Sequence, residues 1–89
     1  MAGMVSLPVT VNGEEKLIKE IEVIGTERTN PEMIKRRMRS KEGEPLVREE
    51  LIEDLHRIYE MGFFKDVKRQ LREKKDGYYI TIVVKEREY

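Results

Sequence analysis

The chain has 89 residues, which leaves room for one domain with a single thin core and excludes a second domain or a large buried cavity. Its 18 Lys and Arg balance 18 Asp and Glu, so no field of the whole chain would gather nucleic acid or an anionic membrane. The lack of cysteine excludes a disulfide framework and thiolate chemistry, and no run of roughly 18 apolar residues indicates a membrane-spanning helix.

Residues 1–16 are predicted to be a lead-in to the domain or a segment added for expression, and residues 17–89 to be the folded domain. The lead-in contains the turn signal Asn12-Gly13, with only Val9 and Val11 alternating as in a weak strand. It has neither the charged nor the apolar region of a secretory signal peptide. We therefore expect the core to be built from residue 17 onward.

The first strand is predicted over residues 17–24 and is expected to end at Gly25. Its apolar side chains follow the two-residue period of a strand. One face is expected to carry Leu17, Ile21 and Val23, and the other Ile18 and Ile24.

A first helix is predicted to begin after Asn30 and to run to about Ser40. The Asn30 side chain can accept a hydrogen bond from a free amide of the first turn, and Pro31 suits the first helical position. Glu32 suits the positive end of the helix dipole. The few apolar residues of this helix are Met33, Ile34 and Met38.

A second helix, expected to end at Gly62, shows the clearest periodicity in the sequence. Five apolar side chains recur at helical spacing and predict a buried stripe. These are Leu51, Ile52, Leu55, Ile58 and Tyr59. The opposite side is expected to face solvent and carries Glu49, Glu50, Glu53, Asp54, His56, Arg57 and Glu60. Gly62 is expected to take the left-handed backbone conformation that stops a helix.

After Gly62 the period changes to two, which predicts a β-hairpin. Val67, Arg69 and Leu71 share one side, and Asp76-Gly77 is the predicted turn. The last strand, from Tyr78 to Val84, is apolar on both faces and is therefore predicted to be a central strand. The order of elements is β-α-α-β-β.

This order and three motifs resemble the POTRA (polypeptide-transport-associated) domain of the outer-membrane barrel-assembly and two-partner-secretion family (BamA/TamA-like). The first motif is Ile21-Glu22-Val23-Ile24-Gly25-Thr26, with Thr26 where the family has Asn. The second and most specific is the run Leu55-His56-Arg57-Ile58-Tyr59-Glu60-Met61-Gly62-Phe63-Phe64-Lys65-Asp66-Val67. The third is Gly77-Tyr78-Tyr79-Ile80-Thr81-Ile82-Val83-Val84-Lys85-Glu86. A further departure is Val47, which stands where the family has a Ser or Thr helix cap.

The resemblance implies an α+β fold in which two helices pack on one face of a three-stranded mixed sheet. It assigns a structural role to Gly25, Gly62, Phe64 and Val67. It also implies that the first hairpin strand lies at a sheet edge and accepts an added peptide strand at Lys65, Val67, Lys68, Arg69, Gln70 and Leu71. The implied partners are unfolded outer-membrane proteins or subunits of an assembly complex, and neighbouring POTRA repeats. The implied location is the periplasmic side of the outer membrane, ahead of a membrane-embedded β-barrel.

No enzymatic activity, cofactor or metal is expected. His56 is the single histidine, and with no cysteine present it lacks the further ligands that a metal site needs. Glu50 and Asp54 are interpreted as a solvated acidic first turn. Two alternatives stay open: the extracytoplasmic POTRA domain of an FtsQ/DivIB-type division protein, and a small RNA-binding module that uses the basic run from Lys35 to Lys41.

Overall fold

The computed structural model describes residues 16–88, so the expectations for Val9, Val11 and the rest of residues 1–15 lie outside the described residues. The elements along the chain are β1 (Ile18–Ile24), α1 (Pro31–Arg37), α2 (Arg48–Tyr59), β2 (Phe64–Lys74) and β3 (Gly77–Glu86). The predicted order β-α-α-β-β is confirmed.

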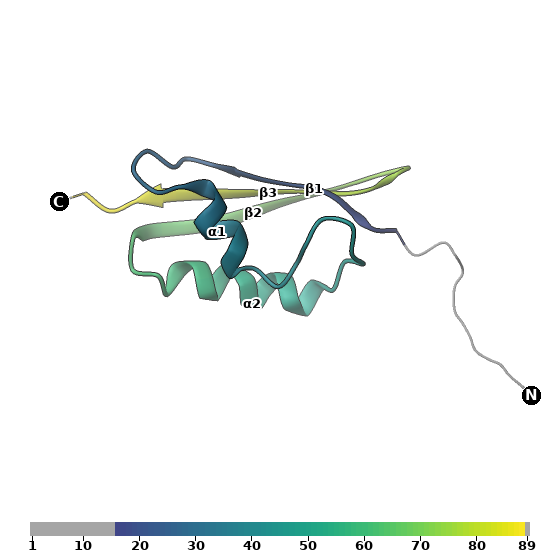
Figure 1. The fold of residues 1–89 in the computed structure, drawn as a ribbon, viewed down its shortest axis with the longest axis horizontal. Helices are drawn as coiled ribbons and strands as arrows, with labels where there is room; N and C mark the ends of the chain where they lie inside the picture. Colours follow the sequence, from purple (N-terminus) through teal and green to yellow (C-terminus); the bar gives the residue numbers. More distant parts are fainter. Residues whose placement is uncertain (1–15, 89) are drawn as a thin grey trace, which may run out of the picture.

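The three strands form one mixed sheet with the order β1-β3-β2. The central strand β3 pairs in parallel with β1 and antiparallel with β2. Parallel neighbours need a long crossover connection, and here that connection contains α1 and α2, which lie on one face of the sheet (Figure 1). The predicted fold class and the central position of the last strand are both confirmed.

The core lies between the helices and the covered face of the sheet. From β3, Ile80, Ile82 and Val84 point into it, and the helices contribute their buried apolar side chains. Phe64, the largest buried side chain, is completely buried at the start of β2. The full set is Ile18, Ile21, Ile34, Met38, Leu51, Ile58, Phe64, Ile80, Ile82 and Val84.

One part of the predicted face assignment in β1 is wrong. The register of β1 against β3 shifts between Ile18 and Glu20, as at a β-bulge. This shift puts Ile18 into the core together with Ile21, whereas Leu17 precedes the strand and is exposed. The alternation holds only beyond the shift, where Ile21 and Val23 both pack in or against the core.

Helix α1 begins as predicted but is shorter than expected. The Asn30 side chain accepts a hydrogen bond from the Glu32 amide at 2.9 Å, and Pro31 is the first helical residue. The helix ends at Arg37: the Met38 amide closes it by donating to the Lys35 carbonyl at 3.2 Å, and the backbone of Met38 is extended. The N–H groups of Arg39 and Ser40 donate to the Asp54 carboxylate on α2, at 2.8 and 3.0 Å.

The predicted solvent-facing side of α2 is wrong at Asp54, which is 0% exposed. Its carboxylate also accepts a hydrogen bond from Arg57 at 2.7 Å, so the buried charge is paired and fully hydrogen-bonded. The interpretation of Asp54 as part of a solvated first turn is therefore corrected. The buried side of α2 is centred on Leu51, Asp54 and Ile58, which leaves Ile52 and Tyr59 of the predicted stripe 48% and 47% exposed.

The two glycines that follow α2 and β1 both have a positive φ but lie in different surroundings. Gly62 has φ +87° after the end of α2, and open space surrounds the position of a Cβ there. Gly25 has φ +98° after β1, and a Cβ would lie 2.0 Å from the carbonyl oxygen of Val84. In the hairpin, Gly77 pairs with Lys74, so the two-residue loop is Lys75-Asp76, one residue before the predicted Asp76-Gly77.

Replacing Phe64 with Ala should lower the free energy of unfolding by about 3–5 kcal/mol, because it leaves a cavity under the helices. The matched control is Phe63→Ala, since the Phe63 side chain is 42% exposed and loses mainly its edge contact with Phe64, worth about 1 kcal/mol. Chemical denaturation of both variants measures the difference. Equal losses would contradict the assignment of Phe64 as the core anchor.

The two glycines should respond differently to the same substitution. Gly62→Ala is expected to cost about 1 kcal/mol, since only the backbone conformation is unfavourable. Gly25→Ala is expected to cost about 2–3 kcal/mol, because the added methyl also overlaps the backbone of β3. Thermal or denaturant melts give both values, and a larger loss at Gly62 would show that backbone crowding at Gly25 is unimportant.

Candidate functional site

The two edges of the sheet differ in how their backbone groups are used. Along β1, the Ile18 amide donates to the Glu44 carbonyl at 2.8 Å, and the Gly43 amide donates to the Ile18 carbonyl at 2.7 Å. The Ile21 amide donates to the Glu42 carboxylate at 2.8 Å. This hydrogen bond, together with the nearby Lys35, lowers the pKa of Glu42. The loop between α1 and α2 therefore closes the first half of the β1 edge.

The other edge is formed by β2, an 11-residue strand. Among residues 16–88, β3 is the only strand that pairs with it. An edge strand presents a row of unpaired backbone donors and acceptors, which another extended chain can use. All the residues predicted to form the peptide-binding edge, from Lys65 to Leu71, lie in this strand.

Side chains of β2 alternate between the two faces of the sheet. Val67 and Leu71 pair with Val84 and Ile80 of β3 and are partly buried on the helix side. Lys68 and Gln70 are exposed on the opposite face, as predicted from the alternation. The register shifts between Phe64 and Asp66, so that both Phe64 and Val67 contribute to the covered side.

A groove of about 350 Å³ runs between α2 and β2, beside the open edge. Its apolar wall consists of Ile52, Leu55, Tyr59 and Val67, with polar groups from His56 and Asp66. Helical periodicity did not indicate this groove, because it places Ile52 and Tyr59 in the predicted buried stripe. The sequence does contain one indication of the groove. The apolar stripe of the helix is wider than the surface that a three-stranded sheet can cover, so side chains at its margin must stay exposed.

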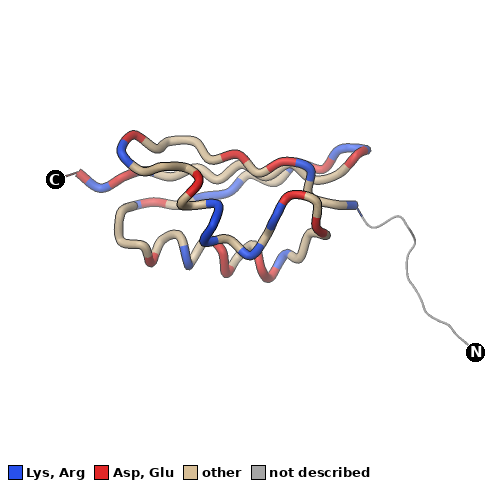
Figure 2. The backbone as a smooth tube through the Cα atoms, viewed as in Figure 1, with Lys and Arg blue, Asp and Glu red and all other residues tan. Residues whose placement is uncertain are grey.

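The basic run from Lys35 to Lys41 does not form one continuous cationic surface. Met38 and Ser40 within it are buried. Lys35 lies 3.5 Å from Glu42, and the Lys41 ammonium donates to the Lys35 carbonyl at 3.0 Å. Figure 2 shows acidic residues in the loop after α1, which carries the second half of the basic run. Part of the charge on which an RNA site would depend is thus already paired within the domain.

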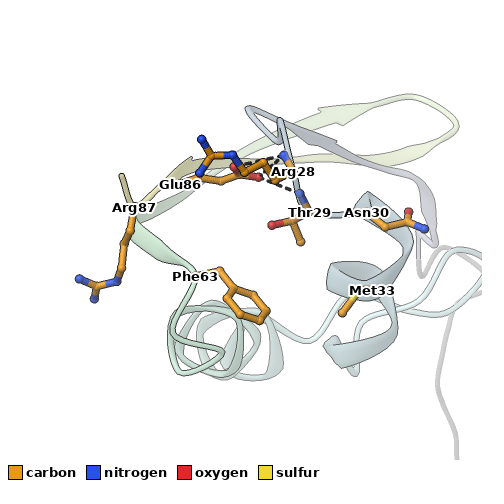
Figure 3. A pocket seen from close by; sticks show the side chains of 7 residues that line it. All are labelled: Arg28, Thr29, Asn30, Met33, Phe63, Glu86 and Arg87. Atoms are coloured by element: carbon orange, nitrogen blue, oxygen red, sulfur yellow. Dashed lines mark hydrogen bonds between the residues drawn. The ribbon is translucent and has the colours of Figure 1, made fainter. Parts of the chain in front are cut away.

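At the far end of β3, the Glu86 carboxylate binds the backbone of the loop that follows β1. It accepts hydrogen bonds from the amides of Glu27 at 2.9 Å, Arg28 at 3.0 Å and Thr29 at 2.9 Å. Figure 3 shows those from Arg28 and Thr29. The amides of Glu27 and Thr29 act most strongly and lower the pKa of Glu86 to about 2. This contact fixes the loop against β3.

Within the described residues, no cluster of three or more His, Cys, Asp or Glu side chains is placed to hold a metal ion. His56 is exposed on α2 and contributes to the groove rather than to such a cluster. None of the helices in residues 16–88 has the length and apolarity needed to cross a membrane.

The fold and the open strand define a small α+β domain of β-α-α-β-β order. Residues 16–87 match the POTRA family, described as surface antigen variable number repeat, and the chain belongs to this family. A comparison with curated protein sequences finds no match.

Solved structures give the same fold. The chain is 30% identical, with a TM-score of 0.71, to the N-terminal domain of Omp85 from Thermosynechococcus elongatus, covering 79% of this chain and 30% of that one. It is 25% identical, with a TM-score of 0.74, to BamA from Haemophilus ducreyi lacking POTRA domains 1–3, covering 81% and 14%. A fold match to POTRA domains 1–2 of Omp85 from Anabaena has a TM-score of 0.70 at 24% identity, covering 79% and 46%. The chain thus spans less than half the length of each.

The Glu86 contact should make stability depend on pH in the acid range. Because its pKa falls from 4.5 to about 2 on folding, the folded state binds fewer protons, and the stabilisation is complete above about pH 4.5. It is lost as the pH falls through about 2. The stability difference between the parent chain and the Glu86→Gln variant should therefore shrink on acidification. The control is Glu88→Gln, at an exposed neighbouring residue, which should differ little from the parent chain at any pH in this range. A difference that stays constant from pH 5 to pH 2, measured in denaturant melts at roughly half-unit steps, would contradict the contact.

Proposed function

We propose that this domain is a periplasmic protein-binding module that receives or docks outer-membrane polypeptides, or assembly partners, by β-strand addition to β2. The observation that carries the proposal is the contrast between the two sheet edges. Glu42 and the backbone of Gly43 and Glu44 occupy the first half of the β1 edge, whereas within residues 16–88 no strand other than β3 pairs with β2. This contrast favours the edge of β2 over the partly closed edge of β1 for an incoming strand.

The surroundings of β2 favour a particular pattern in the added strand. Its side chains would alternate between the helix side and the opposite face of the sheet. On the helix side they would meet the apolar groove walled by Ile52, Leu55 and Tyr59. On the opposite face they would lie beside Lys68 and Gln70. An extended segment that alternates apolar and polar residues fits both faces, and strands of outer-membrane β-barrels have this alternation.

Backbone hydrogen bonds would supply most of the attraction, so recognition would tolerate many client sequences. The site adds only a short ladder of hydrogen bonds, and the peptide must be ordered on binding. We therefore expect dissociation constants in roughly the micromolar-to-millimolar range for one isolated domain. Such weak binding suits a module that passes clients on.

The proposed location is the periplasm, within an array of POTRA repeats that precedes an outer-membrane β-barrel. Support comes from the structures that this chain resembles, which include BamA lacking POTRA domains 1–3 and part of the periplasmic domain of Omp85. Several of them contain two or three consecutive POTRA domains. The matches to Omp85 and BamA favour this assignment over a division protein.

A peptide titration followed by amide NMR tests the binding site. An extended, aromatic-containing segment of alternating apolar and polar residues should shift the amides of residues 65–71. Ile52→Ser combined with Tyr59→Ser should weaken binding without unfolding the domain, since both side chains are about half exposed. Met33→Ser on α1, where the side chain is 43% exposed, is the matched control and should leave the affinity unchanged.

Proline substitution at Lys68 and, separately, at Arg69 adds a test of the backbone contribution. Adjacent amides of a strand point in opposite directions, so one of the two faces the open edge and the other faces β3. Proline at the outward amide should abolish a peptide hydrogen bond while the fold persists, and proline at the inward amide should destabilise the sheet. Shifts that instead gather on residues 35–41 and vanish with added salt would refute strand addition and support electrostatic binding.

A further inference from the structure

A second concave surface lies at the end of the domain where β3 ends. It is a hollow of about 390 Å³ whose apolar floor comes from Met33 on α1 and Phe63 before β2. Arg28 and Arg87 line its margin (Figure 3). Met33 and Phe63 are 43% and 42% exposed, so two large apolar side chains lie together at the surface. Such a cluster is typical of an interaction site.

Contacts inside the domain hold this hollow open. The Phe63 ring stands edge-on to the buried Phe64 ring, with 6.1 Å between centroids and an interplanar angle of 83°. The Arg87 amide donates to the Phe63 carbonyl at 2.9 Å. The Glu86 carboxylate fixes the backbone of Arg28 and Thr29 in the opposite wall. The walls are therefore positioned by hydrogen bonds before anything binds.

The topology determines what lies next to the hollow. Because β1 and β3 are parallel, β1 begins at one end of the sheet and β3 finishes at the other (Figure 1). We name these the leading end and the trailing end. The hollow is at the trailing end, and Arg87 lies both in its wall and directly after β3. A domain joined after residue 88 would start at the margin of the hollow.

The leading end has the complementary character. Leu17 precedes β1, and Val47 occupies the position directly before α2. Both have exposed apolar side chains. The exposed Glu44 accepts a hydrogen bond from the Ile18 amide through its backbone carbonyl, and the next residue, Pro45, forms a β-bridge with Leu17. One end of the domain thus offers an apolar hollow with two arginines at its margin, and the other offers exposed apolar side chains in the same segments as the exposed acidic residue Glu44.

We propose that the hollow formed by Met33, Phe63, Arg28 and Arg87 is the seat for the leading end of the next POTRA domain in a tandem array. Apolar side chains of that domain fill the hollow, and a carboxylate pairs with the arginines at its margin. The inference rests on the tandem arrangement included in the proposed function, but it uses a surface separate from β2. Docking of this kind sets the orientation of each open β2 edge relative to the next.

The probe is a tandem protein in which the 89-residue chain is followed directly by a second copy of residues 16–88, which contain every described strand, helix and core residue. Nitrogen-15 relaxation should show the two copies tumbling as one body. Relative to the single chain, amide shifts should appear in residues 28–33, 63 and 86–87 of the first copy. In the second copy they should appear at residues 17 and 44–47.

Met33→Ser with Phe63→Ser in the first copy should make the two copies tumble separately, with the correlation time falling towards that of the single chain. Arg87→Glu, which keeps the apolar floor, should act in the same direction. The matched control, Ile52→Ser with Tyr59→Ser in the first copy, has equal exposure and should change nothing. Denaturant melts of the single-chain variants establish that each is folded.

Two results would overturn the proposal: separate tumbling of the parent tandem, with shifts confined to residues 87–89, or common tumbling that neither hollow variant changes. The peptide titration at β2 is independent of both results, because the hollow variants should keep the client affinity of the parent chain. If the tandem interface forms but no peptide binds at β2, strand addition is refuted. If peptide binds at β2 but the two copies tumble separately, the docking seat is refuted.

Discussion

The parallel pairing of β1 with β3 is the constraint on which the rest of the domain depends. Parallel neighbours cannot be joined by a tight turn, so the chain between them must cross one face of the sheet, and both helices form on that crossover. The same crossover supplies Glu42 and Glu44, which close the first half of the edge of β1. β2 forms a hairpin with β3 and lies on the side of β3 opposite to β1. Within residues 16–88, no strand pairs with its outer edge.

Local signals were sufficient to predict the elements, because each depends on nearby residues. Asn30-Pro31 marks the start of α1, Gly62 follows α2 with a positive φ, and the apolar faces of the last strand place it in the centre. The errors have non-local causes. Asp54 looks like a solvent-facing residue on its own helix, but it is buried because amides 14 and 15 residues away need an acceptor. The bulge near Ile18 likewise depends on the register with β3.

The candidate site was predictable only in part for the same reason. The resemblance to POTRA domains located the edge strand, but helical periodicity shows only which side chains share a face, not how much of that face a partner covers. The sheet under α2 is narrow, so the side chains at the margin of the stripe, Ile52 and Tyr59, remain exposed and form a groove. The hollow at Phe63 had no sequence signal, because its walls come from three separate segments of the chain.

Asp54 and Glu86 share a property that bears on how this fold can diversify. Both carboxylates act on backbone amides, of residues 39–40 and 27–29 respectively. Every amino acid except proline carries such an amide, so the side chains at residues 27–29 and 39–40 can be substituted without breaking the tertiary contact. The carboxylates of Asp54 and Glu86 cannot be replaced in this way. Two carboxylates thus hold the fold without depending on the side chains of the loops they bind. Related domains can therefore differ in surface charge while they keep the same fold.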